Sequence, residues 1–251
     1  MDGGEEVAEG MRDRVCVATV TWARGEGEQQ LLRTSLLRLA ETGLMIVVSD
    51  RDSGPAFRDF LQSLPQFRVV PPGGPSLVGQ VQASLTAAAN TGADFILYTE
   101  SDKDVFFADG LTAFLDRVDL QPRTGAAIAA RSDASFSTFP TLQRFTERTI
   151  NELCARFIGT PGDYSYGPFV LNRELVPRVA GLAPDVGWGW RHFLFGTAVR
   201  LGYTVTHLVG DYPCPPDQRE ENDAEQIHRV RQLAQNIQGL LLSTTIAGTP
   251  Q

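Results

Sequence analysis

The sequence predicts an α/β protein with a mostly parallel, Rossmann-like sheet, helices on both of its faces and an irregular second lobe. Apolar runs of strand length alternate with segments of helical period from residue 14 to about residue 130, which is the pattern of successive βαβ units. The next segment, up to residue 185, is richer in Ser, Thr, Pro and Gly. The 251 residues are 42% hydrophobic and 21% charged, so we predict one globular domain with two lobes.

Four apolar runs in the first half are expected to be strands, each followed by a helix. Residues 44–49 are apolar almost without a break, as in a parallel strand covered on both faces. Gly43 suits the left-handed turn after the first helix, Pro55 suits the first turn of the second, and Ser76 can cap the third. The predicted strands are 14–21, 44–49, 67–70 and 94–99; the predicted helices are 29–42, those starting at Pro55 and after Ser76, and one with Leu111, Phe114, Leu115 and Val118 on one face.

The second half is expected to begin after a strand over 126–130 and to end with a long helix over 222–242. Between them we predict a helix over 141–157 and a β segment over 163–172. One side of the final helix is apolar, and we expect this side to pack back on the body of the protein. The residues on it are Ile227, Val230, Ala234, Ile237 and Leu241.

Net charge and cysteine content disfavour several classes of protein. There are 22 basic and 30 acidic residues, a net charge of −8, whereas a nucleic-acid-binding surface needs a basic surplus. Cys16, Cys154 and Cys214 are too far apart for a disulfide framework or a CxxC zinc site, which favours a reducing compartment. No window resembles a signal or a transmembrane segment, so we expect a cytoplasmic protein with a flexible acidic tail over residues 1–13.

The carboxyl ends of the strands are the expected binding edge, because ligands of open α/β sheets bind there. The turn after the first strand lacks the third glycine of G-x-G-x-x-G, and no P-loop motif is present, which disfavours dinucleotide-dependent hydride transfer and P-loop phosphotransfer. The fourth strand ends in Glu100-Ser101-Asp102. Its alternate carboxylates can face Mn²⁺ or Mg²⁺ bridging two phosphates, although a solvated acidic turn is the alternative.

Residues Arg14 to Phe107 resemble the nucleotide-binding half of a GT-A-fold glycosyltransferase, in which such a strand ends in the metal-binding D-x-D motif. The segments GWGWRH at 187–192 and GYTVTHL at 202–208 are similar to the acceptor side of these enzymes. The resemblance implies one GT-A-like domain over 14–251, with a nucleotide-sugar-binding half over 14–130 and an acceptor half over 131–251. The group it resembles comprises the retaining mannosylglycerate and glucosyl-phosphoglycerate synthases.

The resemblance also assigns roles at the nucleotide site. Asp102 is the carboxylate expected to bind the cation, and Glu100, in place of the family's Asp, is expected nearer the ribose. Asp50 is expected against the base or ribose, and Thr21 and Trp22 are expected to line the base pocket. Ser101 completes the acidic triplet. Glu100 departs from the family's Asp, and its longer side chain would shift the position of the metal.

A second set of roles concerns the metal and the acceptor. Asp211, just past the last strand, is the candidate for a further metal ligand, whereas His207 is expected to be a satisfied core residue. Asp185 is the candidate catalytic carboxylate, with a turn residue as the alternative. Aromatic faces and a fixed cation suit a sugar or an anion, so the acceptor candidates are Trp188, Trp190 and Arg191, with helix-start core residues as the alternative for the tryptophans. Arg131 is expected either to reach a phosphate or to be solvated.

The function implied by the resemblance is metal-dependent transfer of a sugar from a nucleotide-diphosphate sugar to a small hydroxylated or anionic acceptor. Two other functions stay open. One is a sugar-phosphate nucleotidyltransferase, although Arg24-Gly25-Glu26 is a poor loop for a triphosphate. The other is a non-catalytic protein that binds a nucleotide-sugar. A homo-oligomer is possible, and neither a nucleic-acid partner nor a transmembrane segment is expected.

Overall fold

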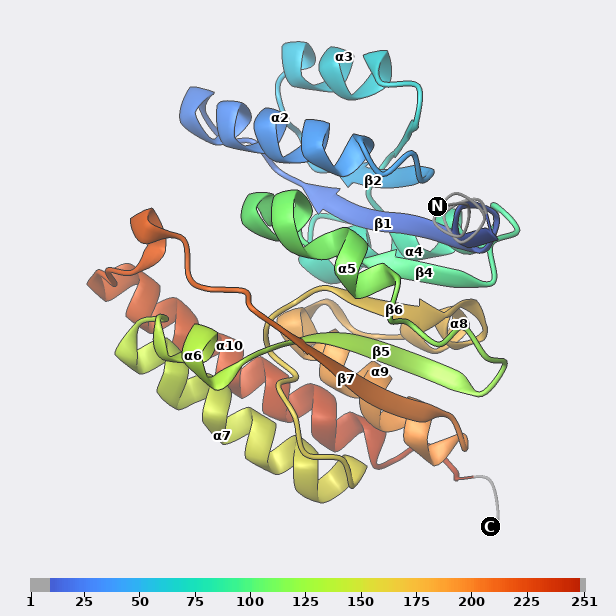
Figure 1. Ribbon diagram of the computed structural model, residues 1–251, viewed down its shortest axis with the longest axis vertical. Coiled ribbons are helices and arrows are strands. Elements are labelled where there is room, and N and C mark those ends of the chain that lie inside the picture. The colour runs from blue at the N-terminus through green and yellow to red at the C-terminus, as the bar shows by residue number, and fades with distance from the viewer. Residues whose placement is uncertain (1–9, 249–251) are drawn as a thin grey trace, which may run out of the picture. The chain divides into compact units, whose positions relative to one another are not determined.

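The structure, a computed structural model, describes residues 10–248 of the chain, and these residues fold into two compact units (Figure 1). The first unit comprises residues up to 117 together with residues 170–177. The second comprises residues 118–169 and those from 178 onward. Of the expected acidic tail, residues 1–9 lie outside the described residues, and residues 10–14 are helical. The strand expected at the end of the first half belongs to the second unit.

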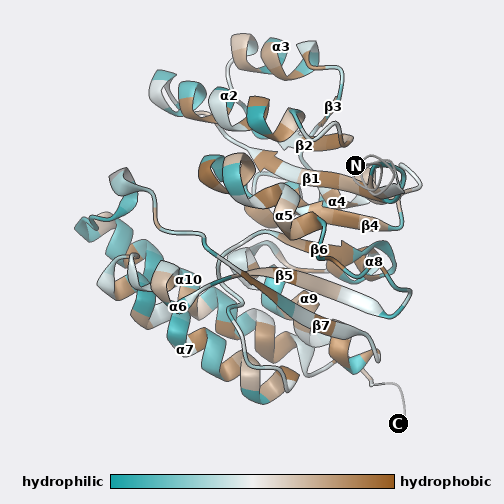
Figure 2. Cartoon of the chain, viewed as in Figure 1, coloured by the Kyte–Doolittle hydropathy of each residue, from teal (hydrophilic) through white to brown (hydrophobic). Residues whose placement is uncertain are grey.

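The first unit is built on parallel strands in the order β3-β2-β1-β4. Thr21 at the end of β1 is paired with Asp50 at the end of β2, so the two carboxyl ends are level. The strands are predominantly hydrophobic (Figure 2), and β2 and β4 are buried along their whole length. Their bounds are β1 Val15–Thr21, β2 Ile46–Asp50, β3 Phe67–Val70 and β4 Phe95–Tyr98, and residues 170–172 of β6 Phe169–Asn172 also lie in this unit.

Helices cover both faces of this sheet. α4 (Leu77–Ala89) packs on β1 and β2, whereas α2 (Glu26–Ala40) lies on the opposite face with the π-helical turn η1 (Phe106–Gly110) (Figure 1). α3 (Pro55–Ser63) packs beside β3, and α5 (Leu111–Leu115) continues η1. The predicted start of α4 is confirmed, because Ser76 Oγ accepts a hydrogen bond from the amide of Gly79 at 3.0 Å. Gly43 has the predicted left-handed backbone, with φ of 68°.

The second unit contains a parallel pair of strands and a helical layer. β5 (Thr124–Arg131) pairs with β7 (Thr204–Gly210), and α9 (Trp190–Arg200) packs on both. α10 (Asp223–Ser243) packs on α9 and on α7 (Thr141–Ile158). The shorter elements are α6 Asp133–Ser137, η2 Arg173–Leu175, α8 Val176–Val179, η3 Pro184–Gly189 and η4 Pro216–Gln218. The β segment predicted over 163–172 is a strand only from Phe169 onward, because side-chain hydrogen bonds from residues 151 and 163 hold the backbone of 164–165 in an irregular loop.

The prediction for the packing side of α10 is wrong. Asn236, Gly239, Leu240 and Ser243 face the body and are buried, whereas Ile227, Val230 and Leu241 are 54–55% exposed. The reason is a close approach of two backbones, since a Cβ atom on Gly239 would overlap the carbonyl of Gly189. Small residues therefore face the body, and the apolar side faces outward.

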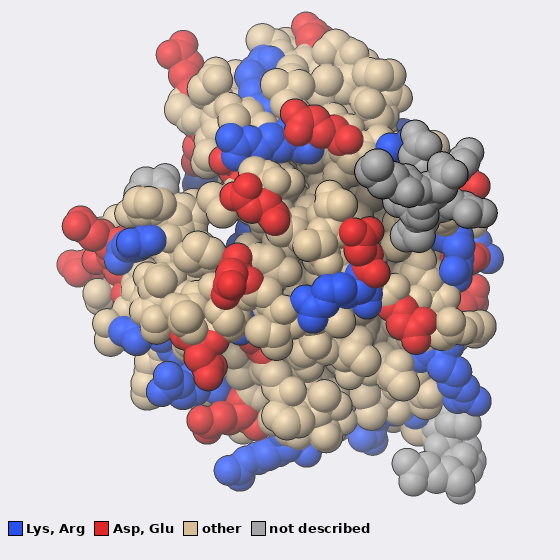
Figure 3. All heavy atoms as spheres, viewed as in Figure 1, with Lys and Arg blue, Asp and Glu red and all other residues tan. Residues whose placement is uncertain are grey.

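Two surface properties bear on the possible partners. Acidic and basic side chains are interspersed on the face shown in Figure 3, and no basic patch dominates the described residues seen there. Within residues 10–248, none of the helices is long and apolar enough to span a membrane.

The three cysteines are all free and buried.

Candidate nucleotide-binding site

The carboxyl ends of β1 and β2 are joined through the carboxylate of Asp50, which is 5% exposed. Asp50 Oδ1 accepts hydrogen bonds from Thr21 Oγ1 at 2.8 Å and from Ser53 Oγ at 2.5 Å. Asp50 Oδ2 accepts from the amide of Ser53 at 3.2 Å, and Ser53 Oγ in turn accepts from the amide of Ala23 at 2.9 Å. The turns after the two strands are thus fixed to each other. The expected contact of Asp50 with a base or ribose stays a prediction.

Gln80 of α4 links the ends of the same two strands through its side chain. Gln80 Nε2 donates to the carbonyl oxygens of Thr21 and Ser49, both at 3.0 Å, and the side chain is 4% exposed. The preceding loop closes tightly, because the amide of Gly73 donates to the carbonyl of Gly79 at 3.1 Å. Sequence reasoning missed Gln80, because α4 also carries Gln82 among its small and apolar residues and the pattern does not single out either glutamine.

Trp22 projects from this edge and is 44% exposed. Two guanidinium groups lie against its ring, with Arg51 Cζ 4.4 Å and Arg24 Cζ 4.9 Å from the centroid. Arg24 is already paired with Glu28, its Nη2 lying 2.5 Å from Oε1. Arg51 has no carboxylate partner among the described residues. Arg51 therefore places a positive charge at the carboxyl edge of the sheet.

The acidic triplet follows β4, as predicted, and its members differ in exposure. Glu100 is half-buried, Ser101 is 7% exposed, and Asp102 is exposed. Among the described residues, no group of three His, Cys, Asp or Glu side chains is arranged to hold a metal ion. Mn²⁺ and Mg²⁺ sites for nucleotides commonly use one or two carboxylates and complete the shell with substrate phosphates and water. Asp102 fits that role, and its position favours metal binding that depends on the nucleotide.

The predicted catalytic and acceptor residues all lie in the second unit. Asp185 is exposed in η3, and its Oδ2 accepts from Gln238 Nε2 at 3.2 Å. Trp188 is half-buried, with its ring 5.1 Å from Arg191 Cζ. Trp190 is fully buried against Phe169, at 5.7 Å between ring centroids. Arg191 is 3% exposed. Trp190 has no accessible surface to offer an acceptor in this conformation, which favours the core alternative for it.

Asp211 and His207 are the two remaining candidates in this unit, and the sequence did not predict the contacts that they make. Asp211 is exposed, and its Oδ1 accepts from Ser132 Oγ at 2.7 Å; its role as a metal ligand stays a prediction. His207 packs edge-on against Tyr164 at 4.4 Å, but neither ring nitrogen has a partner among the described residues. The expectation of a satisfied histidine is therefore wrong. Burial lowers the pKa of His207, and Asp163 opposes this shift.

A pocket of about 540 Å³ lies in the second unit at the carboxyl end of β5. Neither Trp188 nor Arg191 lines it. Of its polar lining residues, the sequence pointed only to Arg131 and His207. The full polar lining is Arg131, Asp133, Arg148, Asn151, Glu152, Asp163 and His207. Arg148, Asn151 and Glu152 are three and four residues apart on α7, a spacing that places them on one helix face.

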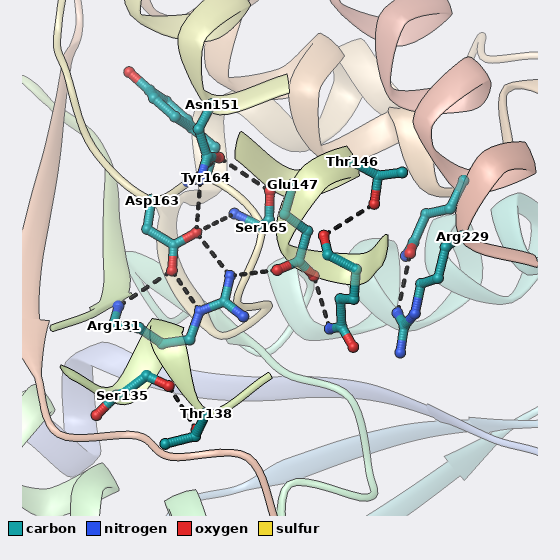
Figure 4. A network of polar contacts seen from close by, with 12 residues as sticks. Arg131, Ser135, Thr138, Thr146, Glu147, Asn151, Asp163, Tyr164, Ser165 and Arg229 are labelled. Atoms are coloured by element: carbon teal, nitrogen blue, oxygen red, sulfur yellow. Dashed lines mark hydrogen bonds and ion pairs between the residues drawn. The ribbon is translucent and has the colours of Figure 1, made fainter. Parts of the chain in front are cut away.

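Arg131 forms the centre of a buried ionic network rather than being solvated (Figure 4). Its Nη2 lies 2.7 Å from Glu147 Oε2, and its Nε lies 2.7 Å from Asp163 Oδ2. The rings of Phe136 and Phe139 lie 4.7 and 4.4 Å from its Cζ. Burial alone would lower the pKa of Arg131, but attraction to Glu147 and Asp163 outweighs it and raises the pKa. This cluster fixes the end of β5 and one wall of the pocket.

His192 predicts a pH dependence of the stability of this unit. Burial, assisted by the charge of Arg191, lowers the pKa of His192 to about 3. An unfolded histidine titrates near pH 6.5, so between these values the unfolded chain binds a proton that the folded chain does not. The free energy of unfolding should therefore fall with pH below about 6.5, by about 2 kcal/mol at pH 5. In urea titrations at pH 7 and 5, His192→Leu should lose this difference.

Thr197→Val is the matched control for His192, because Thr197 is fully buried on the same helix and does not titrate. This variant should keep the difference between pH 7 and pH 5. If His192→Leu keeps it too, the group that titrates lies elsewhere.

The chain has the GT-A fold of nucleotide-sugar glycosyltransferases, which confirms the predicted fold class. The glucosyl-3-phosphoglycerate synthase of Mycobacterium tuberculosis, in complex with Mn²⁺, uridine diphosphate and glucosyl-3-phosphoglycerate, matches with a TM-score of 0.66 and 16% identity, over 98% of this chain and 85% of that one. Mannosyl-3-phosphoglycerate synthase from Rubrobacter xylanophilus matches with a TM-score of 0.64 and 13% identity, over 94% and 75%. No protein-family model matches the chain, and the curated proteins give no significant match.

Proposed function

We propose that the protein is a glycosyltransferase that moves a sugar from a nucleotide-diphosphate sugar to a small hydroxylated or anionic acceptor. The observation that carries the proposal is the carboxyl edge of the first unit, where the Asp50 cluster, Arg51 and the exposed Asp102 follow neighbouring strands. The GT-A fold supports it. So do the synthases of that fold, whose solved complexes hold Mn²⁺ with UDP-glucose and phosphoglyceric acid or glycerol 3-phosphate.

Different residues of this edge would bind different parts of the donor. Thr21, Asp50 and Ser53 form a rigid floor for the base and ribose, and Trp22 offers an exposed aromatic surface beside it. Arg51 supplies a positive charge for the diphosphate. Asp102 would hold Mn²⁺ or Mg²⁺ together with diphosphate oxygens, and the cation supplies Lewis-acid stabilisation of the departing diphosphate.

The acceptor side rests on residues of the second unit. Asp185 and the exposed part of Trp188 remain the candidates for contacting the acceptor, with Arg191 holding Trp188 in place. Asp211 remains the candidate for a further metal ligand. The buried, free thiols support the expected reducing, cytoplasmic location.

A sugar-phosphate nucleotidyltransferase is the weaker candidate. That reaction needs free cations in the loop after the first strand to hold a triphosphate. Arg24, the one cation in the loop 23–27, is engaged by Glu28, which reduces its value for phosphate binding. Release of pyrophosphate from a nucleoside triphosphate and a sugar phosphate would favour this candidate over a glycosyltransferase.

Asp102→Ala should abolish the metal-dependent part of nucleotide binding. With UDP, GDP, ADP or dTDP at a hundredfold excess over Kd, the matching diphosphate should stabilise the wild type by about 2.7 kcal/mol, or about 5–10 °C in Tm. Mn²⁺ should strengthen this shift only when the nucleotide is present, because the protein alone provides too few ligands. Thermal-shift curves with and without Mn²⁺ measure both effects.

Asp109→Ala is the matched control, because Asp109 is an exposed carboxylate on η1, just after the triplet. It should keep the full metal-dependent shift. A full shift in Asp102→Ala as well would show that the cation is held elsewhere. Stabilisation by a diphosphate with no turnover of any nucleotide-sugar would favour the non-catalytic binding protein.

A further inference from the structure

The outward side of α10, the red helix in Figure 1, is apolar over most of its length. Ile227 and Val230 are each 54% exposed, and Leu241 is 55% exposed. Ala234 is exposed and Ile237 is half-buried between them. Large apolar side chains scattered singly are normal on a protein surface, whereas a continuous row along one helix marks an interaction site.

The spacing of this row is that of a helix that pairs with another helix. Residues 227, 230, 234, 237 and 241 are separated alternately by three and four positions, which is the a/d pattern of a coiled-coil seam. Towards its end, the row borders a groove of about 420 Å³ lined by Ala234, Ile237, Gln238, Leu241, Leu242 and Thr245. Side chains at a and d positions fill such grooves on a facing helix.

α10 is already ordered before any partner arrives. Its opposite side packs on α9, α7 and η3, and its start is closed by a capping box between Asn222 and Glu225. A short helix pairing in isolation would have to be ordered at the moment of association. Here that cost has been met by folding, so a seam of about two heptads, residues 227–241, needs less association energy than a disordered segment would.

The charges around α10 favour an antiparallel copy of the same helix as the partner, because α10 is acidic in its first turn and Arg200 of α9 lies beside its other end, where α10 itself has no basic residue. Asp223 and Glu225 are exposed in the first turn, and Arg200 lies at the other end, donating to the carbonyl of Ile246 at 2.9 Å. A second α10 running antiparallel brings its acidic first turn towards Arg200 of the other copy, and it aligns the helix dipoles favourably. A parallel copy would place Asp223 beside Asp223 and Arg231 beside Arg231.

We propose that the chain forms a two-fold symmetric homodimer in which α10 packs antiparallel against α10 of a second copy. The seam is self-complementary in this direction, since each a position meets a d position. Val230 then lies opposite Leu241 of the partner subunit, and Ala234 lies opposite Ile237 of the partner subunit. Each contact occurs twice because of the symmetry.

Sedimentation of the full chain over a range of about 1–100 µM tests the dimer. The wild type should be dimeric, and Leu241→Glu should raise the dissociation constant at least about 100-fold, because two charges enter the seam. Leu37→Glu is the matched control, since Leu37 is a 46% exposed leucine on α2. It should dimerise as the wild type does. A wild type that is monomeric throughout, or a Leu241→Glu variant as dimeric as the wild type, overturns the proposal.

Disulfide crosslinking tests the direction, and the buried native thiols do not interfere with it. A mixture of Val230→Cys and Leu241→Cys should oxidise to a crosslinked heterodimer, whereas each variant alone should stay uncrosslinked. Crosslinking of each variant to itself, and not to the other, would overturn the antiparallel arrangement.

Discussion

Replacing Arg131 with methionine should lower the free energy of unfolding by about 3–5 kcal/mol. The side chain is 1% exposed and neutralises two carboxylates, Glu147 and Asp163, that are each 10% exposed. Removing the guanidinium leaves both charges in a site that water barely reaches, and such uncompensated burial is what makes the loss large. Urea unfolding at pH 7 measures it.

The loss in the free energy of unfolding caused by Arg131→Met should become smaller as the pH falls. Burial raises the pKa of Asp163, but Arg131 and several hydrogen bonds outweigh it and hold the pKa below its usual value. In the variant the Asp163 carboxyl can take up a proton before unfolding, so the difference in the free energy of unfolding between the variant and the wild type narrows towards pH 4. The triple variant Arg131→Met, Glu147→Gln, Asp163→Asn should recover part of the stability. A single variant within about 1 kcal/mol of the wild type would rule out an electrostatic role for the network.

Gly239→Ala should destabilise the second unit by about 1–3 kcal/mol, even though alanine is the better helix former by about 1 kcal/mol. A Cβ atom at this position overlaps the carbonyl of Gly189, and a Cβ on Gly189 overlaps the carbonyl of Gln235. Both obstacles are backbone atoms, which cannot rotate away. The added methyl must therefore push α10 off η3.

Gly27→Ala is the control for this change, because Gly27 lies in α2 and nothing lies within 4 Å of its virtual Cβ. It should raise the free energy of unfolding slightly, by about 0.5 kcal/mol. Opposite signs for the two substitutions, measured by urea titration, would identify the α10–η3 contact as the cause. Equal, small effects would mean that the helix shifts freely.

The carboxyl edge of the first unit could be predicted from the sequence because it depends on local signals. The strand period, the turn residues and the rule for carboxyl ends place Thr21, Asp50 and Asp102 at one edge, and the structure pairs the first two. The prediction did not extend to Ser53 and Gln80, which complete the hydrogen bonding of that edge. Their partners belong to other strands, and no local pattern records them.

The predictions that failed concern contacts between residues that are far apart in the sequence. The helical period showed that Ile227, Val230 and Leu241 share a side of α10, but not that Gly239 on the opposite side permits the closer packing. Arg131 read as an isolated charge because its partners lie 16 and 32 residues further along the chain. The irregular loop before β6 is fixed by side chains of α7, which a β-like composition does not reveal.

One buried thiol in each unit can be used to measure how often that unit opens locally. Cys16 lies in β1 of the first unit and is 1% exposed, and Cys154 lies in α7 of the second and is fully buried. Burial raises the pKa of Cys16 to about 11 and that of Cys154 to about 12, so neither is a thiolate at neutral pH while its unit is closed. An alkylating reagent can then react with either thiol only while its unit is locally open. The labelling rates of Cys16 and Cys154, resolved by mass spectrometry, therefore report which of the two units opens more readily.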